Sequence, residues 1–321
     1  MLNESSLSEI TFRNLPFRAD YTFDCGQAFR WNRLDENGND WLGIVLGNLV
    51  RVTNHSFSII GASKTSSEIA QALDVERYLS LDRDLDTIVA SFPESSTLDS
   101  AVTEYYGLRV LRQDPWECLI SFLCSINCNI PSIKFRIENI CRRFGTRIES
   151  GALDGRYYSF PSPEALARAD KRELLSCKLG FRWKYVRHVS REVSAGNLDL
   201  NSLTQLPYEF VSRELISEKS GKTFGVGPKV ADCVSLFSLD KLEAFPIDIW
   251  MMRCLNSFYP DLAKWSHSEY HEQLSQRKYL GLSRAIRAHF GPYAGYAQQY
   301  LYMWIRSNSF KKKSRLEGKR K

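Results

Sequence analysis

Short strand-like runs separated by turn residues dominate the chain from about residue 23 to residue 81. The strand-like runs are residues 28–31, 41–46 and 49–52. Asn37-Gly38 and Gly47-Asn48 separate them, and both pairs are typical of tight hairpin turns. The pattern predicts a small antiparallel β-sheet in this part of the chain.

From Asp114 onward the apolar residues recur at helical spacing. Asp114 can cap a helix that has Pro115 at its first position and Glu117 at its third, an order close to a capping box. The run 118–126 is apolar on all sides, so this helix should be central and buried. We expect Pro131 to end it, because the residue before a proline avoids the α region.

A second helix should follow, with apolar residues on one face between 133 and 144 and with Gly145 as its stop. Ser162-Pro163 should begin another helix, and the pattern stays mostly helical to about residue 307. The fold class that we expect is therefore α+β. A small antiparallel sheet domain (1–98) would pack on a mainly helical domain (99–307), followed by a basic disordered tail (308–321).

The composition is that of a soluble globular protein, with 43% hydrophobic and 25% charged residues. No apolar run approaches the roughly 18 residues that a membrane span needs. The N-terminus has neither the basic start nor the apolar segment of a signal peptide, so we expect a cytoplasmic protein, or a nuclear one in a eukaryote. None of the eight cysteines forms a Cys-x-x-Cys pair, which favours buried thiols over disulfides.

The formal net charge of +6 comes entirely from the end of the chain. Residues 310–321 hold seven Lys or Arg and one Glu, which leaves the rest of the chain neutral. Such a tail can add salt-sensitive attraction to phosphates, or it can simply aid solubility. Net charge does not decide between these two roles.

The segment 223–233, Thr-Phe-Gly-Val-Gly-Pro-Lys-Val-Ala-Asp-Cys, carries the most informative pattern. Gly225-Val226-Gly227 predicts a tight turn whose backbone N–H groups can point outwards, and Pro228 suits the first position of a helix. Turn and helix N-terminus together form an anion site that needs no basic side chain. A neutral domain can therefore hold the phosphate of a nucleic acid.

Lys229 lies in the first turn of this helix, and Cys233, four residues on, faces the same way. A lysine at the positive end of a helix, beside a closed pocket, is held towards its neutral amine form and can act as a nucleophile. A solvated lysine is the simpler interpretation of the position taken alone. Asp248 makes the nucleophile more plausible than the solvated lysine, because a carboxylate inside the apolar segment 244–250 is costly unless it pairs with a charge or caps a helix.

The patterns Gly-Val-Gly-x-Lys-Val-Ala-Asp-Cys and Pro-x-Asp resemble the helix-hairpin-helix DNA glycosylases and, within them, the eukaryotic-type 8-oxoguanine DNA glycosylase family. Four further blocks resemble the same family in the same order, and together they cover most of the chain from residue 23 to residue 304. The blocks are residues 25–31, 114–119, 179–186 and 291–298. The resemblance implies that the helical domain is a helix-hairpin-helix glycosylase domain.

The resemblance further implies a bifunctional DNA glycosylase and AP lyase, which flips 8-oxoguanine out of duplex DNA and excises it. Lys229 would attack the sugar C1′ and form a Schiff base, and Asp248 would stabilise the positive charge that develops on the sugar. Proton removal from the imine would then break the 3′ strand by β-elimination. The implied partner is double-stranded DNA that contains 8-oxoguanine, bound by a monomer with no role for a membrane.

Five residues are assigned by the resemblance to the flipped base. They are Gly26, Cys233, Pro246, Gln298 and Tyr302. The Gly26 carbonyl would accept the N7 hydrogen that 8-oxoguanine has and guanine lacks, so guanine would be repelled there. Gln298 would bind the Watson–Crick edge, and Tyr302 and Cys233 would lie against opposite faces of the base. A turn glycine, a surface amide and a core aromatic are the simpler interpretations of Gly26, Gln298 and Tyr302.

Six residues are assigned to DNA around this pocket. They are Asn127, Phe181, Arg182, Gly225, Gly227 and Trp250. Asn127 would fill the gap left by the flipped base, while Phe181 would wedge beside the estranged base and Arg182 would bind it. Gly225, Gly227 and Trp250 would lie along the backbone of the DNA.

No cofactor is expected. Iron–sulfur members of the superfamily carry a four-cysteine loop near the C-terminus, whereas the last cysteine here is Cys254. No side chain is expected to bind a metal ion. Backbone carbonyls of Gly221, Thr223 and Val226 can form a structural cation site.

The chain departs from the family where the base opposite the lesion is read. Cys128 interrupts the family's run of three asparagines, and Trp250 replaces a histidine near the phosphate. Ser132 stands in place of an arginine that contacts the opposite cytosine. Because a serine is too short to replace a guanidinium fork, we expect a relaxed opposite-base preference. Lys134 compensates only if the helix turns it towards the DNA.

Two alternatives remain open at this point. One is a helix-hairpin-helix glycosylase for another damaged base, although glycosylases for alkylated bases generally lack the catalytic lysine. The other is a non-catalytic DNA-binding module. Covalent trapping with borohydride separates an enzyme with an active lysine from such a module.

Overall fold

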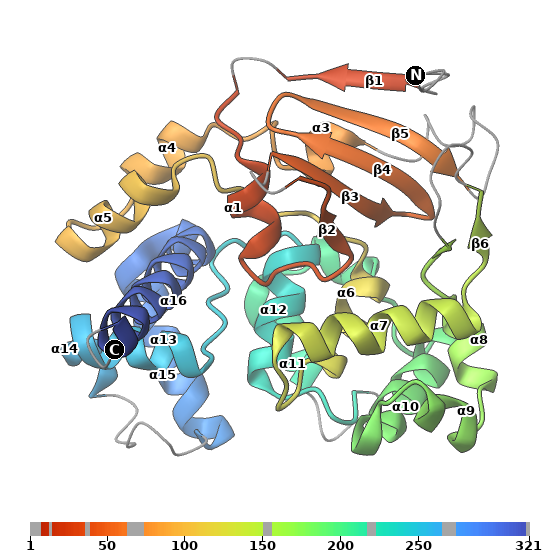
Figure 1. Cartoon of the computed structure of the whole chain (residues 1–321). Coiled ribbons are helices and arrows are strands. Elements are labelled where there is room, and N and C mark those ends of the chain that lie inside the picture. Colours follow the sequence, from red (N-terminus) through yellow and green to blue (C-terminus); the bar gives the residue numbers. More distant parts are fainter. Residues whose placement is uncertain are drawn as a thin grey trace.

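The computed structural model describes residues 8–12, 15–35, 39–62, 74–149, 156–216, 223–264 and 274–318. A five-stranded antiparallel sheet forms the N-terminal part, with the strand order β1-β5-β4-β3-β2 (Figure 1). The strands are β1 (Ser8–Thr11), β2 (Trp31–Arg33), β3 (Asp40–Val45), β4 (Asn48–Thr53) and β5 (Ser56–Ala62). The expected α+β class, with its N-terminal antiparallel sheet and its helical body, is confirmed.

The sheet begins earlier in the chain than the pattern predicted, and a helix interrupts it. β1 pairs with β5, and α1 (Ala19–Asp24) lies between β1 and β2. Residues 28–30, predicted as strand, lie in an irregular segment before β2 instead. Ala28 and Phe29 are buried in the interior, and the Phe23 ring of α1 stacks on Trp31 at a centroid distance of 3.9 Å. Burial, not strand pairing, thus explains the apolar character of this run.

The hairpin between β3 and β4 turns one residue earlier than predicted. Leu46 and Gly47 have positive φ values of 48° and 78°, and Val45 pairs with Asn48 on either side of them. This is the backbone conformation of a two-residue hairpin turn, and its twist has the same sense as that of the flanking strands. The other predicted turn, Asn37-Gly38, lies outside the described residues.

Helices make up most of the remaining chain. Those that follow the sheet directly are α3 (Val75–Tyr78), α4 (Leu85–Ala90) and α5 (Ser96–Tyr105). The helices of the central and C-terminal parts are α6 (Pro115–Cys124), α7 (Ile130–Phe144), α8 (Pro163–Arg168), α9 (Lys171–Ser176), α10 (Trp183–Ser194), α11 (Tyr208–Ile216), α12 (Pro228–Ser238), α13 (Ile249–Phe258), α14 (Pro260–Ala263), α15 (Gln276–Phe290) and α16 (Ala294–Gly318).

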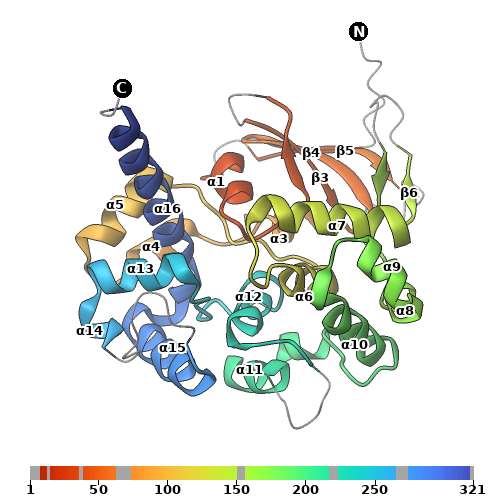
Figure 2. The same ribbon diagram turned by 60° about the horizontal axis from the view of Figure 1, so that its bottom comes forward.

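Shorter elements connect these helices. They are the 3₁₀ turns η1 (Gly180–Arg182), η2 (Ser202–Gln205) and η3 (Gly291–Tyr293), and the strand pair β6 (Arg147–Ile148) and β7 (Tyr157–Tyr158). In Figures 1 and 2, α12 lies between a group formed by α13 to α16 and a group formed by α7 to α10. The helix that begins with the Gly-Val-Gly turn therefore lies at the centre of the helical body.

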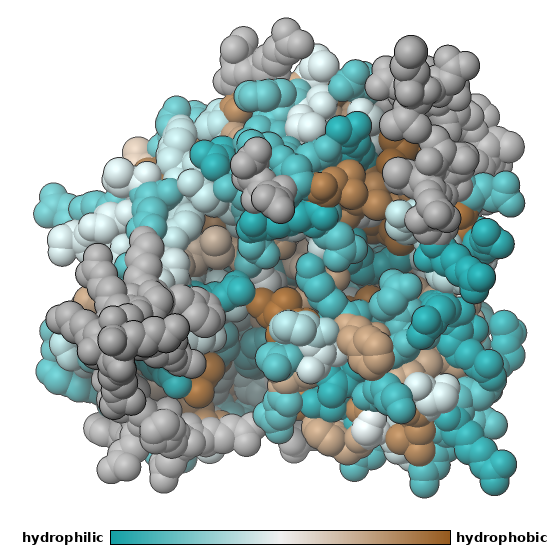
Figure 3. All heavy atoms as spheres, viewed as in Figure 1, coloured by the Kyte–Doolittle hydropathy of each residue, from teal (hydrophilic) through white to brown (hydrophobic). Residues whose placement is uncertain are grey.

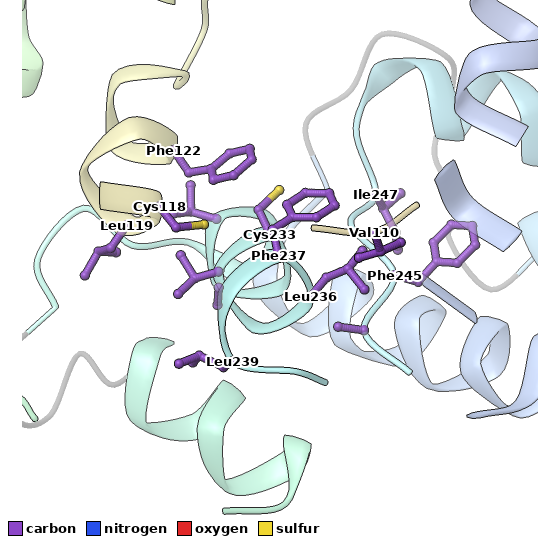
Figure 4. Packing of buried hydrophobic residues seen from close by; sticks show 14 of the residues in the cluster. Val110, Cys118, Leu119, Phe122, Cys233, Leu236, Phe237, Leu239, Phe245 and Ile247 are labelled. Atoms are coloured by element: carbon purple, nitrogen blue, oxygen red, sulfur yellow. The ribbon is translucent and has the colours of Figure 1, made fainter. Parts of the chain in front are cut away.

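The core around α12 is built from apolar side chains of α6 and of the segment before α13. Figure 4 shows Phe122 of α6 and Ile247 on either side of Cys233 and Phe237 of α12. α6 is buried as predicted, and the Asp114 carboxylate caps it by accepting the backbone N–H of Glu117 at 2.8 Å. The buried helix is thus fixed at the end where it enters the core.

The prediction that Pro131 ends this helix was wrong. α6 already ends at Cys124, and α7 begins at Ile130 with Pro131 in its first turn. A proline lacks the N–H that a first-turn residue would leave unpaired, so it suits a helix start as well as the position after a helix end. The predicted stop of α7 at Gly145 is confirmed.

The predicted boundary at residue 307 does not coincide with the end of an element. α16 continues as helix to Gly318, although a disordered tail was expected from residue 308. The expected boundary after residue 98 falls inside α5. None of the helices in the described ranges is long and apolar enough to cross a membrane.

On the face in Figure 3, hydrophobic side chains reach the surface in separate small groups.

A buried ion pair fixes the start of α6 against the segment before β2. Arg30 Nη1 lies 3.3 Å from Glu117 Oε2, and their side chains are 6% and 19% exposed. The Arg30 guanidinium also donates to the carbonyl of Tyr158. Burial raises the pKa of Glu117 to about 7, although Arg30 opposes this shift. The carboxyl therefore changes its charge near neutral pH.

Glu117→Gln is expected to flatten the pH dependence of the free energy of unfolding. Between the ordinary pKa of 4.5 and about 7, the folded protein holds a proton at Glu117 that the unfolded chain releases. The contribution of Glu117 to the free energy of unfolding is thus complete below pH 4.5. It falls by about 3 kcal/mol as the pH rises through 7. Urea unfolding at pH 5 and pH 8 measures the effect. The exposed Glu94→Gln serves as control, and equal pH dependences in both variants would contradict the assignment.

Candidate active site

The turn before α12 requires glycine for two independent reasons. Gly225 has a φ of +92°, and a Cβ there would lie 2.3 Å from Cγ of Tyr185. The Val226 N–H donates to the Thr223 carbonyl at 2.9 Å, which closes the turn. Gly227 then begins α12, whose N-terminus has no side-chain cap. The first-turn N–H groups remain open to an anion, as the sequence predicted.

Lys229 and Cys233 share one face of α12, as their spacing predicted. The Lys229 amine hydrogen-bonds with the Cys233 thiol and lies 5.1 Å from the centroid of the Phe122 ring of α6. Cys233 is 2% exposed, and burial raises the pKa of its thiol to about 12. The amine thus lies between an aromatic ring and a neutral thiol.

Asp248 caps α13 and lies close enough to Lys229 for the charge of the amine to influence the carboxyl. Its Oδ1 accepts the backbone N–H of Met251 at 2.9 Å. Burial raises the pKa of the Asp248 carboxyl above its ordinary value, while the Met251 N–H and the charge of Lys229 oppose the shift. Asp248 therefore has both of the roles that the sequence allowed, a helix cap and a carboxylate close to Lys229.

Gly26 and Tyr302 come together from opposite ends of the chain. Gly26 has a φ of +76°, and a Cβ there would lie 3.3 Å from Tyr302 Oη and 3.6 Å from Cδ1 of Ile130. Burial raises the pKa of Tyr302, and the nearby Asp248 carboxylate raises it further. These contacts place Gly26 and Tyr302 beside the Lys229, Cys233 and Asp248 group.

The remaining residues assigned to the flipped base are buried. Gln298 lies one turn before Tyr302 on α16 and is 3% exposed, so it is not a surface amide. Its Oε1 accepts the Nε2–H of Gln299 at 2.5 Å. Pro246, two residues before Asp248, is also buried.

Arg306 connects two segments of this site and was missed from the sequence. Its Nη1 donates to the Asp24 carbonyl at 2.9 Å, and its guanidinium lies 6.0 Å from the centroid of the Tyr302 ring. Asp24 lies two residues before Gly26, so Arg306 ties the glycine turn to the helix that carries Tyr302. The spacing of Arg306, one turn after Tyr302, was the available sequence signal.

Asn127, Phe181 and Arg182 also lie together, although they come from separate loops. Asn127 has a left-handed φ of 49°, and the Phe181 ring is 46% exposed with the Arg182 guanidinium 4.4 Å from its centroid. Arg182 itself is buried, and it donates to the carbonyls of Ile126, at 2.8 Å, and Asn127, at 3.2 Å. Its guanidinium acts here as a brace between the two loops.

The structure excludes Lys134 from this arrangement and adds Arg136. Lys134 Nζ donates to the Trp31 carbonyl at 2.6 Å and so points towards the sheet. Arg136, one turn after Ser132, donates to the Lys178 carbonyl at 2.9 Å and to the Ser132 carbonyl at 3.1 Å. It also contacts the Cys128 thiol. Lys134 therefore does not compensate for Ser132 in this structure.

Aromatic rings connect Phe181 with the turn before α12. The Tyr185 ring has its centroid 6.0 Å from that of Phe181 and 5.0 Å from that of Phe224. Phe224 is 49% exposed, and Gly225 lies against Tyr185. Trp250 lies in the first turn of α13, where the Arg253 guanidinium is 4.9 Å from its ring centroid.

The metal and cofactor predictions stay predictions. Among the residues that the structure describes, no three His, Cys, Asp or Glu side chains gather in a way that could hold a metal ion. Gly221, one of the three carbonyls of the expected cation site, lies outside the described residues. The Thr223 carbonyl already accepts the Val226 N–H.

Two protein-family models match the chain, one after the other. The first, "8-oxoguanine DNA glycosylase, N-terminal domain", matches residues 9–119, and the second, "HhH-GPD superfamily base excision DNA repair protein", matches residues 120–278. The N-glycosylase/DNA lyase OGG1 of Arabidopsis thaliana is 31% identical over 294 residues, which are 88% of this chain and 75% of the relative. The chain belongs to the 8-oxoguanine DNA glycosylase family. It is a DNA glycosylase with AP lyase activity, of the helix-hairpin-helix superfamily.

Solved structures agree with this family assignment. The 8-oxoguanine glycosylase/lyase of Clostridium acetobutylicum in its apo form is 32% identical, with a TM-score of 0.78 over 94% of this chain and 97% of that one. The same relative, in complex with double-stranded DNA containing cytosine opposite 8-oxoguanine, has a TM-score of 0.79. A 3-methyladenine DNA glycosylase from Archaeoglobus fulgidus, at 18% identity and a TM-score of 0.68, shares the fold.

Proposed function

We propose that this glycosylase flips 8-oxoguanine out of double-stranded DNA and excises it, with Lys229 as nucleophile. The observation that supports this most is the convergence of the Lys229 amine, the Cys233 thiol and the Asp248 carboxylate beside Gly26 and Tyr302. An amine with a partly buried carboxylate beside it suits attack on a sugar carbon that gains positive charge.

The proposed reaction has three steps. The Lys229 amine bonds to the sugar C1′ as the bond from C1′ to the base breaks, and the base leaves with the electron pair. Opening of the sugar ring gives a protonated Schiff base between Lys229 and C1′. Loss of a proton from C2′ then expels the 3′ phosphate by β-elimination, and water releases the lysine.

Borohydride trapping tests this proposal. Reduction of the imine should link the enzyme covalently to a duplex that contains 8-oxoguanine and leave an undamaged duplex unlinked. Excision of 8-oxoguanine without a trapped product would exclude the Schiff base. Duplexes with an alkylated base or an oxidised pyrimidine test the alternative of another lesion. A non-catalytic DNA-binding module would bind the duplexes and cut none.

A relaxed preference for the base opposite the lesion is the second part of the proposal. The expected cytosine readers are Arg182 and, in the family, an arginine at the position of Ser132. Arg182 is held by backbone carbonyls, and Ser132 lies in the first turn of α7 with its N–H bonded to Asn129 Oδ1 at 3.0 Å. A good bidentate contact with a base gives about 1–3 kcal/mol of discrimination, and its absence should flatten the preference.

Single-turnover excision of 8-oxoguanine opposite each of the four bases should therefore differ by less than about a hundredfold. Ser132→Arg should raise the rate opposite cytosine relative to adenine by about tenfold, because it restores a fork of donors. Ser132→Gln, which adds length without the charged fork, is the matched control. A cytosine preference above about a hundredfold in the parent enzyme would contradict the proposal and would point to Arg136 as a substitute reader.

A further inference from the structure

Asp232 is a buried carboxyl that the proposed reaction does not use. It lies on α12 three residues after Lys229 and is 1% exposed. Its Oδ1 accepts the Tyr208 hydroxyl at 2.6 Å, and its Oδ2 accepts the Tyr279 hydroxyl at 2.8 Å. A buried carboxylate is costly unless such donors satisfy it. This buried carboxyl, with its unfavourable desolvation free energy, lies in the same helix as the proposed nucleophile.

Tyr279 extends the hydrogen-bond chain towards the other catalytic residue. Its hydroxyl oxygen accepts the backbone N–H of Ile247 at 3.0 Å, and Ile247 directly precedes Asp248. A phenol has one proton to donate and a lone pair to accept. The Tyr279 hydroxyl donates its proton to Asp232, so its lone pair is directed at the Ile247 N–H.

Tyr208 differs from Tyr279 in this respect. Tyr208 comes from α11 and donates to the same carboxyl, with Ser283 Oγ 3.5 Å from its hydroxyl and the Arg287 guanidinium 4.2 Å from its ring centroid. These contacts direct Tyr208 towards α15 and away from the segment before α13. The two tyrosines thus support one carboxyl equally, but Tyr279 is the member of the pair that reaches the backbone next to Asp248.

We propose that Asp232 and Tyr279 are positioning residues that set the separation between Lys229 and Asp248. Asp232 belongs to the helix of Lys229, and Tyr279 holds the peptide beside Asp248, so two hydrogen bonds connect the two catalytic segments through α15. The inference rests on the proposed roles of Lys229 and Asp248. A misplacement of about 1 Å between reacting groups can slow catalysis about a hundredfold.

Tyr279→Phe and Tyr208→Phe are the matched variants that test the proposal. Each removes one hydroxyl donor from Asp232, so both should lower the melting temperature, Tyr279→Phe further because it also removes the acceptor of the Ile247 N–H. Tyr279→Phe should slow single-turnover excision of 8-oxoguanine at least about tenfold and leave duplex affinity within about twofold. Tyr208→Phe should slow excision less than about threefold.

Hydrogen–deuterium exchange gives a readout that a general loss of stability would not produce. The Ile247 amide should exchange faster in Tyr279→Phe and at the parent rate in Tyr208→Phe. Equal losses of excision rate in both variants, or a parent-like rate in folded Tyr279→Phe, would overturn the positioning role. If Tyr279→Phe does not fold, Asp232→Asn should show the same loss of rate at unchanged affinity, and a parent-like rate there would equally overturn it.

Failure of the proposed function would look different. Excision without borohydride trapping in the parent enzyme would remove Lys229 from the chemistry, whatever the tyrosine variants do. Trapping in the parent enzyme together with equal rates in the two tyrosine variants would retain the chemistry and overturn only the positioning role.

Discussion

Lys229→Gln is expected to abolish both base excision and borohydride trapping, while the affinity for a duplex containing 8-oxoguanine stays within a few fold of the parent value. Glutamine keeps most of the length of the side chain and its contact with Phe122, but its amide nitrogen has no nucleophilic lone pair. The expected phosphate site consists of backbone N–H groups at the start of α12 and in the preceding turn, which the substitution leaves in place.

Lys264→Gln is the matched control for this experiment. Lys264 follows α14, its side chain is 73% exposed, and it pairs with Asp261 at 2.6 Å. It should excise and trap at the parent rate. Normal trapping by Lys229→Gln would remove Lys229 from the role of nucleophile. Loss of DNA affinity together with activity would indicate that the side chain mainly supports binding.

Asp248→Asn is expected to slow single-turnover excision at least about tenfold without loss of stability, because a charge aimed at a developing cation is commonly worth a few kcal/mol. Asparagine is as good an N-cap as aspartate, so the hydrogen bond to the Met251 N–H and the start of α13 should persist. The variant therefore separates the charge of Asp248 from its role as a cap.

The stability of this variant has a defined sign. Burial raises the pKa of Asp248 above 3.8, so its contribution to stability is complete below that pH and is lost as the pH rises through the raised pKa. The substituted asparagine carries no charge at any pH in this window, so the variant should melt at or above the parent temperature at neutral pH. A near-normal excision rate in the folded variant would reduce Asp248 to a cap.

A second N-cap provides the control. Asp170 caps α9 by accepting the Glu173 N–H at 2.8 Å, and α9 lies apart from α12 and α13 in Figures 1 and 2. Asp170→Asn makes the same chemical change at the start of another helix. It should leave excision unchanged. A similar slowing in both variants would show that the substitution acts through the fold and not through the active-site charge.

Local signals in the sequence predicted many elements correctly. The caps at Asp114 and Ser162, the stop at Gly145 and the turn before α12 depend on residues within a few positions of each other. The errors arose where distant packing decides the outcome. Residues 28–30 resemble a strand because they are buried, with Phe29 packed against Phe122 of α6. Pro131 lies in the first turn of a helix because Asn129 caps that helix by accepting the Ser132 N–H.

In the site, too, contacts between residues near each other in the sequence were predictable and contacts between distant residues were not. Helical spacing placed Cys233 on the face of Lys229, and the isolated charge of Asp248 marked a residue with a partner. The pairing of Gly26 with Tyr302 spans most of the chain, and the resemblance to the family was the source of that assignment. Hydrogen bonds that join Asp232 to Tyr279, or Arg306 to Asp24, leave no periodic pattern in the sequence.

The contact between Gly225 and Tyr185 limits how this enzyme can evolve. A side chain at position 225 is excluded while the tyrosine ring remains, because a Cβ would lie 2.3 Å from it. The same ring also packs against Phe181, with the ring centroids 6.0 Å apart. On the proposed roles of Phe181 and of the turn, a mutation that reshapes the Tyr185 ring should therefore affect the contact with the bases and the contact with the DNA backbone together. A substitution at Tyr185 should couple these two properties.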